Sequence, residues 1–353
     1  MTTISLRKKR VLVTGGAGFI GSHVSDYLIG KGHQVTILDD LSGGLRENVN
    51  PKATFVEGSI NNKKLIDEIV EEKEIIYHFA AYAAEGLSHF IRSYNYDNNL
   101  MGSVNLVTAA IKNKVKSFLF TSSMAVYGSG NPPFSEDDYP KPEDPYGNAK
   151  FAVEQDLRCA HDLFGLDYII TRPHNVYGER QFLGDPYRNV IGIWRNRIMQ
   201  NQPPMIYGDG EQTRAFSYIG DVASCLANAP FLEKAKNHII NIGAAKPYTI
   251  NELATQVLEA MDSDLSIQYV ESRHEVKHAH CTTQKSEDLL NFEDKTSLRE
   301  GLKRMADWAK KNGPMEPIVW EGYELTEKLP KFWVKLKDEY PDAKKRIDAS
   351  RLG

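Results

Sequence analysis

Tyr146 and Lys150 stand four residues apart in the segment DPYGNAKF, residues 144–151. Asp144 is a favourable N-cap and Pro145 suits the first helical position, so this segment predicts the start of a helix. Residues four apart in a helix lie on the same face. The lysine ammonium can then lie near the tyrosine phenol, and the pair can do acid–base chemistry if its surroundings favour the phenolate.

A glycine-rich turn occurs near the start of the chain, in RVLVTGGAGFIGSHV, residues 10–24. Gly15, Gly18 and Gly21 stand between a predicted strand and a predicted helix, where glycine permits a tight turn and close approach of the backbone to a diphosphate. The helix N-terminus supplies N–H donors for that diphosphate. Asp39 ends the second predicted strand and suits a ribose 2′-hydroxyl, whereas it repels a 2′-phosphate. The sequence therefore predicts NAD rather than NADP as the cofactor.

The cofactor supplies a reason for the tyrosine to ionise. A free phenol has a pKa of about 10, which is too high for a base near neutral pH. A neighbouring ammonium and a positively charged nicotinamide both favour the phenolate, so we expect a lowered pKa for Tyr146. Ser122 and Ser123 end the run FLFTSS, residues 118–123, and their hydroxyls can donate and accept hydrogen bonds. A serine, a tyrosine and a lysine are expected to converge beside the dinucleotide.

The first half of the chain alternates short apolar runs with longer helical patterns. The apolar runs, which we predict to be strands, span residues 10–14, 34–39, 53–58, 75–80, 117–123 and 167–173. The helical patterns span residues 21–32, 61–72 and 98–113. Parallel neighbours need crossover connections, so this order predicts a parallel sheet covered by helices on both faces. The expected fold class is α/β, with a doubly wound Rossmann sheet.

The regular alternation weakens after residue 178, where Gly, Pro and polar residues become frequent. Such composition is typical of long functional loops. We therefore expect a dinucleotide-binding domain over residues 1–178 and a smaller substrate-binding lobe over 179–330. Periodicity returns over residues 215–245, which we expect to rejoin the first domain. Residues 331–353 are expected to form an aromatic-bearing C-terminal extension.

Composition excludes several classes of protein. The 353 residues are 41% hydrophobic and 25% charged, with a formal net charge of -4, which is typical of a globular protein and not of one that binds nucleic acid. The first residues contain no long apolar run, so neither a signal peptide nor a membrane span is expected. Three widely spaced cysteines form no disulfide framework, which favours a cytoplasmic location.

Five segments occur in an order that resembles a known family, the extended short-chain dehydrogenase/reductases, in their nucleotide-sugar epimerase and dehydratase branch. The segments are TGGAGFIG, SSMAVYG, PYGNAK, RPHNVYG and GDGEQTRAFSYIGDV. The resemblance covers roughly residues 10–310. It implies an NAD-dependent enzyme acting on a nucleotide sugar.

The resemblance implies roles for individual residues. Ser123 is the implied active-site hydroxyl, Tyr146 the base, and Lys150 the residue that perturbs the tyrosine and binds the nicotinamide ribose. Relatives often carry an aspartate where this chain has Ser59, which predicts altered contact with the adenine. The implied cofactor-binding residues are Gly15, Gly18, Phe19, Ile20, Gly21, Asp39, Ser59, Ile60, Ala80, Tyr82, Asn99, Tyr146 and Lys150.

The resemblance also implies substrate-binding residues beside Ser123. Asn175 resembles the residue that contacts the nucleotide-sugar diphosphate, and Arg214 and Arg273 resemble two arginines that clamp it. Guanidinium groups suit phosphate oxygens because they donate in a bidentate fashion. Arg273 lies in SRHEVKHAH, which departs from the proline-glycine-aspartate version found in relatives.

His274, His278, His280 and Cys281 are residue types that can bind zinc. There is no paired Cys-x-x-Cys, and the stretch coincides with the phosphate loop that the resemblance implies. We therefore expect no metal site.

The reaction depends on which further acid–base groups stand near Ser123 and Tyr146. Relatives that eliminate water or lose a carboxyl group typically carry an acid at the position of Ala125, and 3,5-epimerising relatives carry a cysteine there. Neither Met124 nor Ala125 can move a proton. The resemblance therefore favours a 4-epimerase for a UDP-hexose or UDP-uronate, similar to UDP-glucose 4-epimerase, which oxidises C4 transiently and returns hydride to the opposite face.

The segment AAYAAEGLSHFIRSYNY keeps other reactions open. Glu85, Ser88 and His89 can supply unconventional groups beside the sugar, or they can be solvated loop residues. A 3,5-epimerase, a 4,6-dehydratase or a decarboxylase is therefore the alternative. A catalytically silent NAD-binding sensor is a further alternative, although Ser123 and Tyr146 both stand at their expected positions.

The expected partners are a nucleotide-sugar substrate and a second copy of the chain, with neither nucleic acid nor membrane. Relatives commonly dimerise through two helices of each subunit. The helices that follow Asn98 and Pro145 are the two expected to form a homodimer here.

Overall fold

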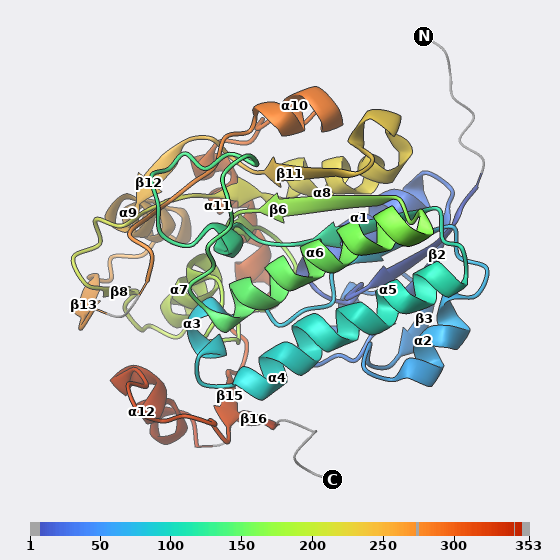
Figure 1. Cartoon of the computed structure of the whole chain (residues 1–353). Coiled ribbons are helices and arrows are strands. Elements are labelled where there is room, and N and C mark those ends of the chain that lie inside the picture. The colour runs from blue at the N-terminus through green and yellow to red at the C-terminus, as the bar shows by residue number, and fades with distance from the viewer. Residues whose placement is uncertain (1–7, 273–274, 342, 348–353) are drawn as a thin grey trace.

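A parallel sheet lies at the centre of the molecule, as the computed structural model shows for residues 8–272, 275–341 and 343–347 (Figure 1). Its strands lie in the order β11-β6-β5-β4-β1-β2-β3, and every neighbouring pair is parallel. The strand order reverses between β1 and β4, and ligands bind at such switch points. The doubly wound sheet predicted from the sequence is confirmed. Its seven strands are β1 (Arg10–Thr14), β2 (Gln34–Asp39), β3 (Thr54–Glu57), β4 (Ile75–His78), β5 (Ser117–Thr121), β6 (Tyr168–Pro173) and β11 (His238–Ile242).

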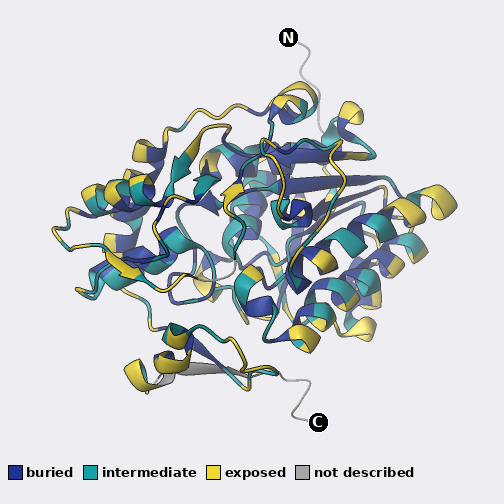
Figure 2. Ribbon diagram, turned by 60° about the vertical axis from the view of Figure 1, so that its left-hand side comes forward, coloured by how far each residue is buried: buried dark blue, intermediate teal, exposed yellow. Residues whose placement is uncertain are grey.

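Helices cover both faces of this sheet, and the strands are buried between them (Figure 2). Side chains alternate along β1: Val11 and Val13 join one hydrophobic core, and Leu12 joins the other. The first core includes α1 (Phe19–Gly30) and α8 (Ile219–Asn228). The second core includes α2 (Lys63–Val70), α5 (Gly102–Lys112) and α6 (Pro145–Phe164).

Short helical segments connect the longer elements. A π-helical segment, η2, leads directly into α5, so the helix predicted over residues 98–113 is present with an irregular first turn. The short helices are η1 (Arg46–Asn48), α3 (Glu85–Ser88), α4 (Arg92–Tyr96), η2 (Asp97–Met101), η3 (Met124–Tyr127), η4 (Ala229–Phe231) and η5 (Glu233–Ala235).

The chain after β6 builds smaller sheets at the carboxyl end of the central sheet, apart from α8 and β11, which belong to the central layers. Strand β10 pairs with β7, β9 lies between β12 and β14, and β13 pairs with β8. The elements are β7 (Val176–Tyr177), α7 (Val190–Met199), β8 (Met205–Tyr207), β9 (Thr213–Ala215), β10 (Ser217–Tyr218), β12 (Pro247–Thr249), α9 (Ile250–Met261), β13 (Gln268–Val270), β14 (His278–Ala279), α10 (Gln284–Leu290) and α11 (Leu298–Asn312).

The C-terminal region lies at one edge of the molecule, at the bottom of Figures 1 and 2. It contains β15 (Ile318–Glu321), α12 (Lys331–Glu339) and β16 (Lys344–Ile347), and β15 and β16 form a parallel pair. Its buried side chains form a hydrophobic cluster separate from the two main cores.

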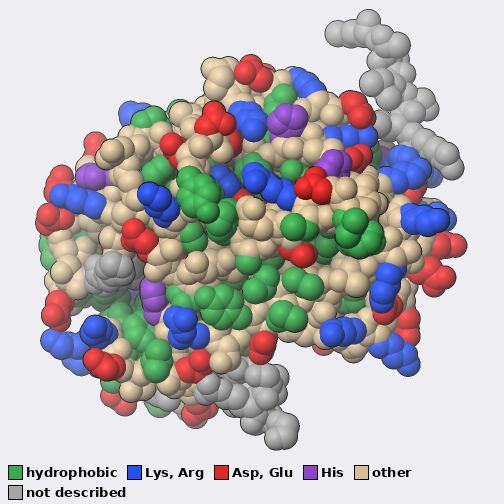
Figure 3. All heavy atoms as spheres, in the orientation of Figure 1, with side chains coloured by type: hydrophobic (Ala, Val, Ile, Leu, Met, Phe, Trp, Pro, Cys, Tyr) green, Lys and Arg blue, Asp and Glu red, His purple; other side chains and the backbone are tan. Residues whose placement is uncertain are grey.

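The molecular surface carries both signs of charge. On the face that Figure 3 shows, basic and acidic side chains are intermingled and neither sign gathers into one large patch. In the described part of the chain, none of the helices combines the length and the apolar character needed to cross a membrane.

The sequence predicted the start of α6 correctly. The Asp144 carboxylate accepts a hydrogen bond of 2.8 Å from the Gly147 N–H, and Pro145 occupies the first turn. The helix ends at Gly165, which adopts a left-handed conformation with φ of 72°. Glycine suits this position because other residues resist a positive φ.

We predict that Gly165→Ala lowers the free energy of unfolding by about 1 kcal/mol, because alanine is strained at positive φ. No atom lies within 4 Å of the added Cβ, so steric contact adds nothing. Urea unfolding measures the effect. Gly30→Ala is the matched control: its Cβ also meets open space, but Gly30 ends α1 without a positive φ, so this change should not destabilise. Equal losses in the two variants would contradict the conformational explanation.

Candidate active site

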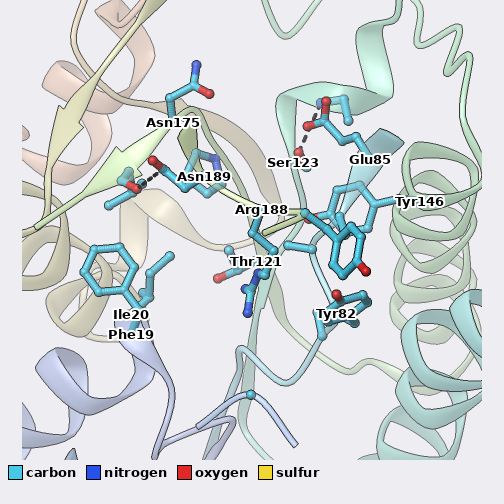
Figure 4. Close-up of a pocket in the computed structure, with 18 of the residues that line it drawn as sticks. Phe19, Ile20, Tyr82, Glu85, Thr121, Ser123, Tyr146, Asn175, Arg188 and Asn189 are labelled. Atoms are coloured by element: carbon cyan, nitrogen blue, oxygen red, sulfur yellow. Dashed lines mark hydrogen bonds between the residues drawn. The ribbon is translucent and has the colours of Figure 1, made fainter. Parts of the chain in front are cut away.

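A cavity of about 480 Å³ opens at the carboxyl ends of β1, β4 and β5, beside the switch point. In Figure 4, Tyr82, Glu85 and Tyr146 lie on one side of this cavity, and Phe19 and Ile20 lie on the opposite side. Most of the sequence-predicted site residues line it: Gly15, Gly18, Phe19, Ile20, Gly21, Asp39, Ile60, Ala80, Tyr82, Ser123, Tyr146, Lys150, Asn175 and Arg214.

The glycine-rich turn fits the dinucleotide that the sequence predicts. Gly15 has a φ of 71°, and a Cβ at this position would lie only 2.6 Å from the backbone nitrogen of Ala80. The N–H of Gly18 donates to the carbonyl of Gly15 at 3.1 Å, which closes the turn. Gly18 is the N-cap of α1 and offers no side-chain acceptor, so the first N–H groups of the helix are suited to a diphosphate.

Asp39 lies at the end of β2 and is buried. Its two carboxylate oxygens accept hydrogen bonds of 2.9 Å from the N–H groups of Ala17 and Leu41. Burial raises the pKa of this carboxyl, and the two backbone hydrogen bonds oppose that rise. The geometry presents a fixed acceptor at the edge of the cavity, as a ribose hydroxyl requires.

Ser123, Tyr146 and Lys150 meet between β5 and α6. The Ser123 hydroxyl caps η3 by accepting a hydrogen bond of 3.1 Å from the Ala125 N–H. The Lys150 ammonium donates to the Thr121 carbonyl at 2.8 Å, and its nitrogen lies 5.7 Å from the centre of the Tyr146 ring. All three predicted catalytic side chains therefore reach one cavity from two adjacent elements.

The protein groups around Tyr146 do not by themselves lower the pKa of its phenol; the lowering that the sequence predicts also needs the positive charge of a nicotinamide and stays a prediction. Burial raises the pKa of Tyr146 well above its usual value, and the charge of Glu85 raises it further. A hydrogen bond with Ser123 and the charge of Arg188 act in the opposite direction. Burial also lowers the pKa of Lys150 to about 7, against the charge of Glu154. Removal of both groups from water thus disfavours the phenolate and the ammonium, and a bound cofactor has to offset this cost.

A buried ion pair beneath the site holds α6 to the sheet. The Glu154 carboxylate accepts hydrogen bonds from the Arg172 guanidinium at 2.9 and 2.5 Å and from the Ser122 hydroxyl at 2.5 Å. Glu154 lies one turn after Lys150, and Arg172 lies in β6. These contacts fix the helix that carries Tyr146.

Of the three residues predicted to contact the substrate diphosphate, Asn175 and Arg214 lie within the described chain. Asn175 lines the cavity, and its amide donates to the Ala215 carbonyl at 3.0 Å. Arg214 also lines the cavity, and its guanidinium donates to backbone carbonyls of Thr213, Val276 and Lys277. Arg273, with its predicted phosphate contact, lies outside the described residues.

Two predicted cofactor residues lie outside the cavity lining. Asn99 is buried behind Tyr82: its amide oxygen accepts from the Tyr82 N–H at 2.8 Å, and its amide nitrogen donates to the Tyr82 carbonyl at 3.1 Å. Asn99 thus supports the lining instead of forming it. The Ser59 hydroxyl accepts a hydrogen bond of 3.2 Å from the Asn61 N–H, whereas the neighbouring Ile60 does line the cavity.

The cavity includes residues that the sequence did not single out. Tyr187, Arg188 and Asn189 line it from the segment before α7. The only available signal was the Gly- and Pro-rich composition of residues 178–189, which indicated a functional loop without indicating a role for Arg188.

The sequence left the role of residues 85–89 open, and the structure places them in two different surroundings. Glu85 and His89 line the cavity. Ser88 does not, and its hydroxyl donates to the Glu85 carbonyl at 2.6 Å and accepts from the Tyr146 N–H at 3.3 Å. Ser88 therefore has a structural role at the start of α6.

The histidine-rich stretch has other contacts. The ring of His278 is hydrogen-bonded to the Thr213 hydroxyl at 2.9 Å, and Cys281 is buried in a small apolar cluster with Phe134. His274 lies outside the described residues. Across the part of the chain that the structure describes, no group of three or more His, Cys, Asp or Glu side chains is placed to hold a metal ion.

We predict that Asp39→Asn lowers the ratio of the NADP dissociation constant to the NAD dissociation constant about tenfold, because the variant loses the charge that repels a 2′-phosphate. Calorimetric titration of the protein with each cofactor measures the two dissociation constants. Asp40→Asn removes the adjacent charge from the same rim and should leave the ratio near its original value. An unchanged ratio in Asp39→Asn would remove this carboxylate from cofactor selection.

Comparison with known proteins places this geometry in a family. The sequence model of the NAD dependent epimerase/dehydratase family matches residues 11–243. A putative UDP-glucose 4-epimerase from Methanocaldococcus jannaschii is 39% identical over 308 residues, which cover 86% of this chain and 99% of the relative. A UDP-N-acetyl-alpha-D-glucosaminuronate decarboxylase from Bacillus cytotoxicus is 33% identical over 317 residues, covering 85% of this chain and 98% of the relative.

A similar solved structure is the UDP-glucose 4-epimerase of Thermotoga maritima with UDP-glucose. It superposes with a TM-score of 0.81 at 36% identity, covering 86% of this chain and 99% of that one. The glycine-rich turn, Asp39 and the serine, tyrosine and lysine around one cavity lie within the matched residues. The chain therefore belongs to the NAD-dependent epimerase/dehydratase family, whose nucleotide-sugar enzymes share its fold and its cofactor.

Proposed function

We propose that the protein is a nucleotide-sugar 4-epimerase that acts on a UDP-hexose or a UDP-uronate. One observation carries the proposal: Ser123, Tyr146 and Lys150 converge on the cavity, while Met124 and Ala125 beside them carry no ionisable group. Oxidation and reduction at C4 need a base and a hydrogen-bonding hydroxyl, and they need no further acid. The similarity to 4-epimerases supports the same reaction.

The mechanism follows from the positions of these groups. NAD held by Gly15, Gly18, Asp39 and Lys150 would supply a reversible hydride acceptor for C4. Tyr146 removes the proton of the C4 hydroxyl and restores it at the end of the cycle. Ser123, hydrogen-bonded to Tyr146, orients the C4 oxygen. Lys150 is buried beside them and supplies positive charge when protonated.

The cofactor is held by this chain's own residues in the same proposal. Gly15, Gly18 and the N-terminus of α1 receive the diphosphate, and Asp39 receives the adenosine ribose. Lys150 receives the nicotinamide ribose, and Tyr82 lies along the cavity with its backbone fixed by Asn99.

The nucleotide sugar occupies the part of the cavity formed by residues 179–330, which we propose as the substrate-binding lobe. Asn175 and Arg214 lie where they can contact its diphosphate, and Arg273 is proposed as the second arginine. Arg214 already donates to backbone carbonyls, which holds its guanidinium at the cavity edge.

Glu85 favours a second candidate, a reaction that needs one more acid–base group, such as decarboxylation, dehydration or 3,5-epimerisation. Glu85 lines the cavity, and its charge acts on both Tyr146 and Asp144. Burial, reinforced by Glu85, raises the pKa of Asp144 to about 7. A carboxyl group with such a pKa can move protons near neutral pH. The similarity to a decarboxylase is consistent with this candidate.

We further propose a cytoplasmic homodimer. The three cysteines are free, which suits a reducing compartment. Helices α5 and α6 form the proposed interface. Met101, which precedes α5, is 46% exposed, and Leu163 and Phe164 at the end of α6 are 75% and 62% exposed.

We predict that the purified protein, without added reductant, interconverts C4 epimers of UDP-glucose or UDP-glucuronate. Proton NMR of the sugar ring identifies the product. Tyr146→Phe should lower kcat by about 10²- to 10⁴-fold, because the ring remains while the base is lost.

Tyr139→Phe is the matched control, since its phenol is 75% exposed outside the cavity and should not affect kcat. A product that has lost water or a carboxyl group would replace the 4-epimerase with the second candidate. Full activity in Tyr146→Phe would remove the phenol from the mechanism.

A further inference from the structure

The C-terminal segment, residues 315–341, packs against the outside of the active-site cavity. Its buried side chains do not join the two main cores. They pack against two loops, the first cavity loop (residues 79–91) and the second cavity loop (residues 178–189). The buried side chains of the segment are Val319, Trp320, Trp333 and Leu336, and their partners from the loops are Tyr82, Ala84, Leu87, Ile91 and Tyr187.

Both loops line the cavity on their other side. Tyr82, Glu85 and His89 come from the first loop, and Tyr187 and Arg188 come from the second. The C-terminal segment contributes no residue to the lining. Its contacts can therefore affect the reaction through the positions of the elements that do line the cavity, among them the two loops.

Two tryptophans contact the first cavity loop. The Trp320 ring stacks on Tyr82 at 5.9 Å with an interplanar angle of 29°, and meets the edge of Tyr94 at 4.8 Å. Trp333 lies so close to Gly86 that an added Cβ would be 3.4 Å from its ring. Such aromatic pairs contribute beyond the area they bury.

Backbone hydrogen bonds complete this contact. The Glu324 N–H donates to the Phe90 carbonyl at 2.8 Å, and the Glu324 carboxylate accepts from the Ser93 N–H at 2.9 Å. The segment is therefore joined to the end of the first loop by directional bonds as well as by apolar packing.

The second cavity loop is held by the same segment. The Trp320 N–H donates to the Tyr187 hydroxyl at 3.0 Å, and the Trp333 ring meets the Tyr187 ring at 5.2 Å. The Ile318 N–H donates to the Gly184 carbonyl at 2.8 Å. Among the described residues of the segment, Trp320 alone joins both loops in this way. Its ring contacts Tyr82, and its backbone N–H contacts Tyr187.

Arg188 lies between these two tyrosines. It follows Tyr187 directly, and its guanidinium carbon is 5.7 Å from the centre of the Tyr82 ring. It lines the cavity close enough to Tyr146 for its charge to act on the phenol. The position of this cation therefore depends on the two side chains that Trp320 holds.

The C-terminal segment lies beyond residue 243, where the match to the family sequence model ends. The match to the M. jannaschii relative covers 86% of this chain and 99% of that relative. About a seventh of this chain lies outside that match.

We propose that Trp320 is a positioning residue that fixes Arg188 in the sugar end of the cavity, where its guanidinium receives an anionic substituent of the sugar. This inference rests on the proposed nucleotide-sugar function and narrows its substrate class to a UDP-uronate. A guanidinium matches a carboxylate by two parallel hydrogen bonds, whereas a hydroxymethyl group offers it no charge. The aromatic contacts hold the second cavity loop in place, so the Arg188 guanidinium stays aligned with that substituent.

The experiment measures binding and therefore does not depend on turnover. The full-length protein with bound NAD is titrated calorimetrically with UDP-glucuronate and with UDP-glucose. The wild type should bind UDP-glucuronate more tightly. Trp320→Ala should weaken UDP-glucuronate binding about tenfold and UDP-glucose binding much less, because a hydrogen bond to a charged group is lost only with the uronate. NAD content should stay unchanged.

Three further variants separate positioning from folding. Trp320→Phe keeps an aromatic ring against Tyr82 and should restore most of the uronate preference. Arg188→Gln should remove that preference with the C-terminal segment intact. Val334→Ala alters a side chain of α12 that is 56% exposed and should behave as the wild type.

Several outcomes would overturn the inference. Equal weakening for both sugars, or loss of NAD in Trp320→Ala, would make the segment merely structural. An unchanged preference in Arg188→Gln, or a wild type that prefers UDP-glucose, would remove Arg188 from substrate selection. If the wild type binds both sugars but epimerises neither, the 4-epimerase proposal fails while the binding ratios still decide this inference. If it binds neither sugar, both fail.

Discussion

The hydrogen bond from the Lys150 ammonium to the Thr121 carbonyl joins α6 to the end of β5, and the rest of the site depends on this junction. One turn further along the helix, the Glu154 carboxylate is paired with Arg172 of β6. A buried ion pair contributes little net stability, but breaking one partner is costly because an uncompensated charge remains. These contacts specify one orientation of α6, and that orientation brings Tyr146 to Ser123.

The cavity results from topology and from two loops that the sheet does not specify. Reversal of strand order between β1 and β4 separates the crossover helices and leaves a crevice at the carboxyl ends of the strands. The glycine turn forms one end of it. The other end is lined by residues 79–91 and 178–189, and Tyr82, Leu87 and Tyr187 of these loops pack with the C-terminal segment in a cluster apart from the two main cores. The first of these loops also carries Ala80 and Tyr82, so the C-terminal segment packs beside predicted cofactor residues as well as beside Arg188.

Short-range signals explain what could be predicted from the sequence. The cap at Asp144, the glycine turn and the acid at Asp39 act within a few residues, so the start of α6 and the dinucleotide end of the cavity follow directly. Arg188 could not be found in this way, because its place depends on contacts between residues more than a hundred positions apart. The burial of Tyr146 could not be predicted either, since spacing reveals a neighbouring charge but not the loss of hydration around the phenol.

The central claim is that hydride leaves C4 and returns to C4 within one cavity, with Tyr146 transferring the proton. UDP-glucose and UDP-glucuronate deuterated at C4 test this directly when the product is examined by deuterium and proton NMR. The account predicts that the C4-inverted product keeps its deuterium at C4, because hydride returns from the bound cofactor and does not exchange with water. Loss of deuterium to solvent, or its appearance at another carbon, would contradict the account.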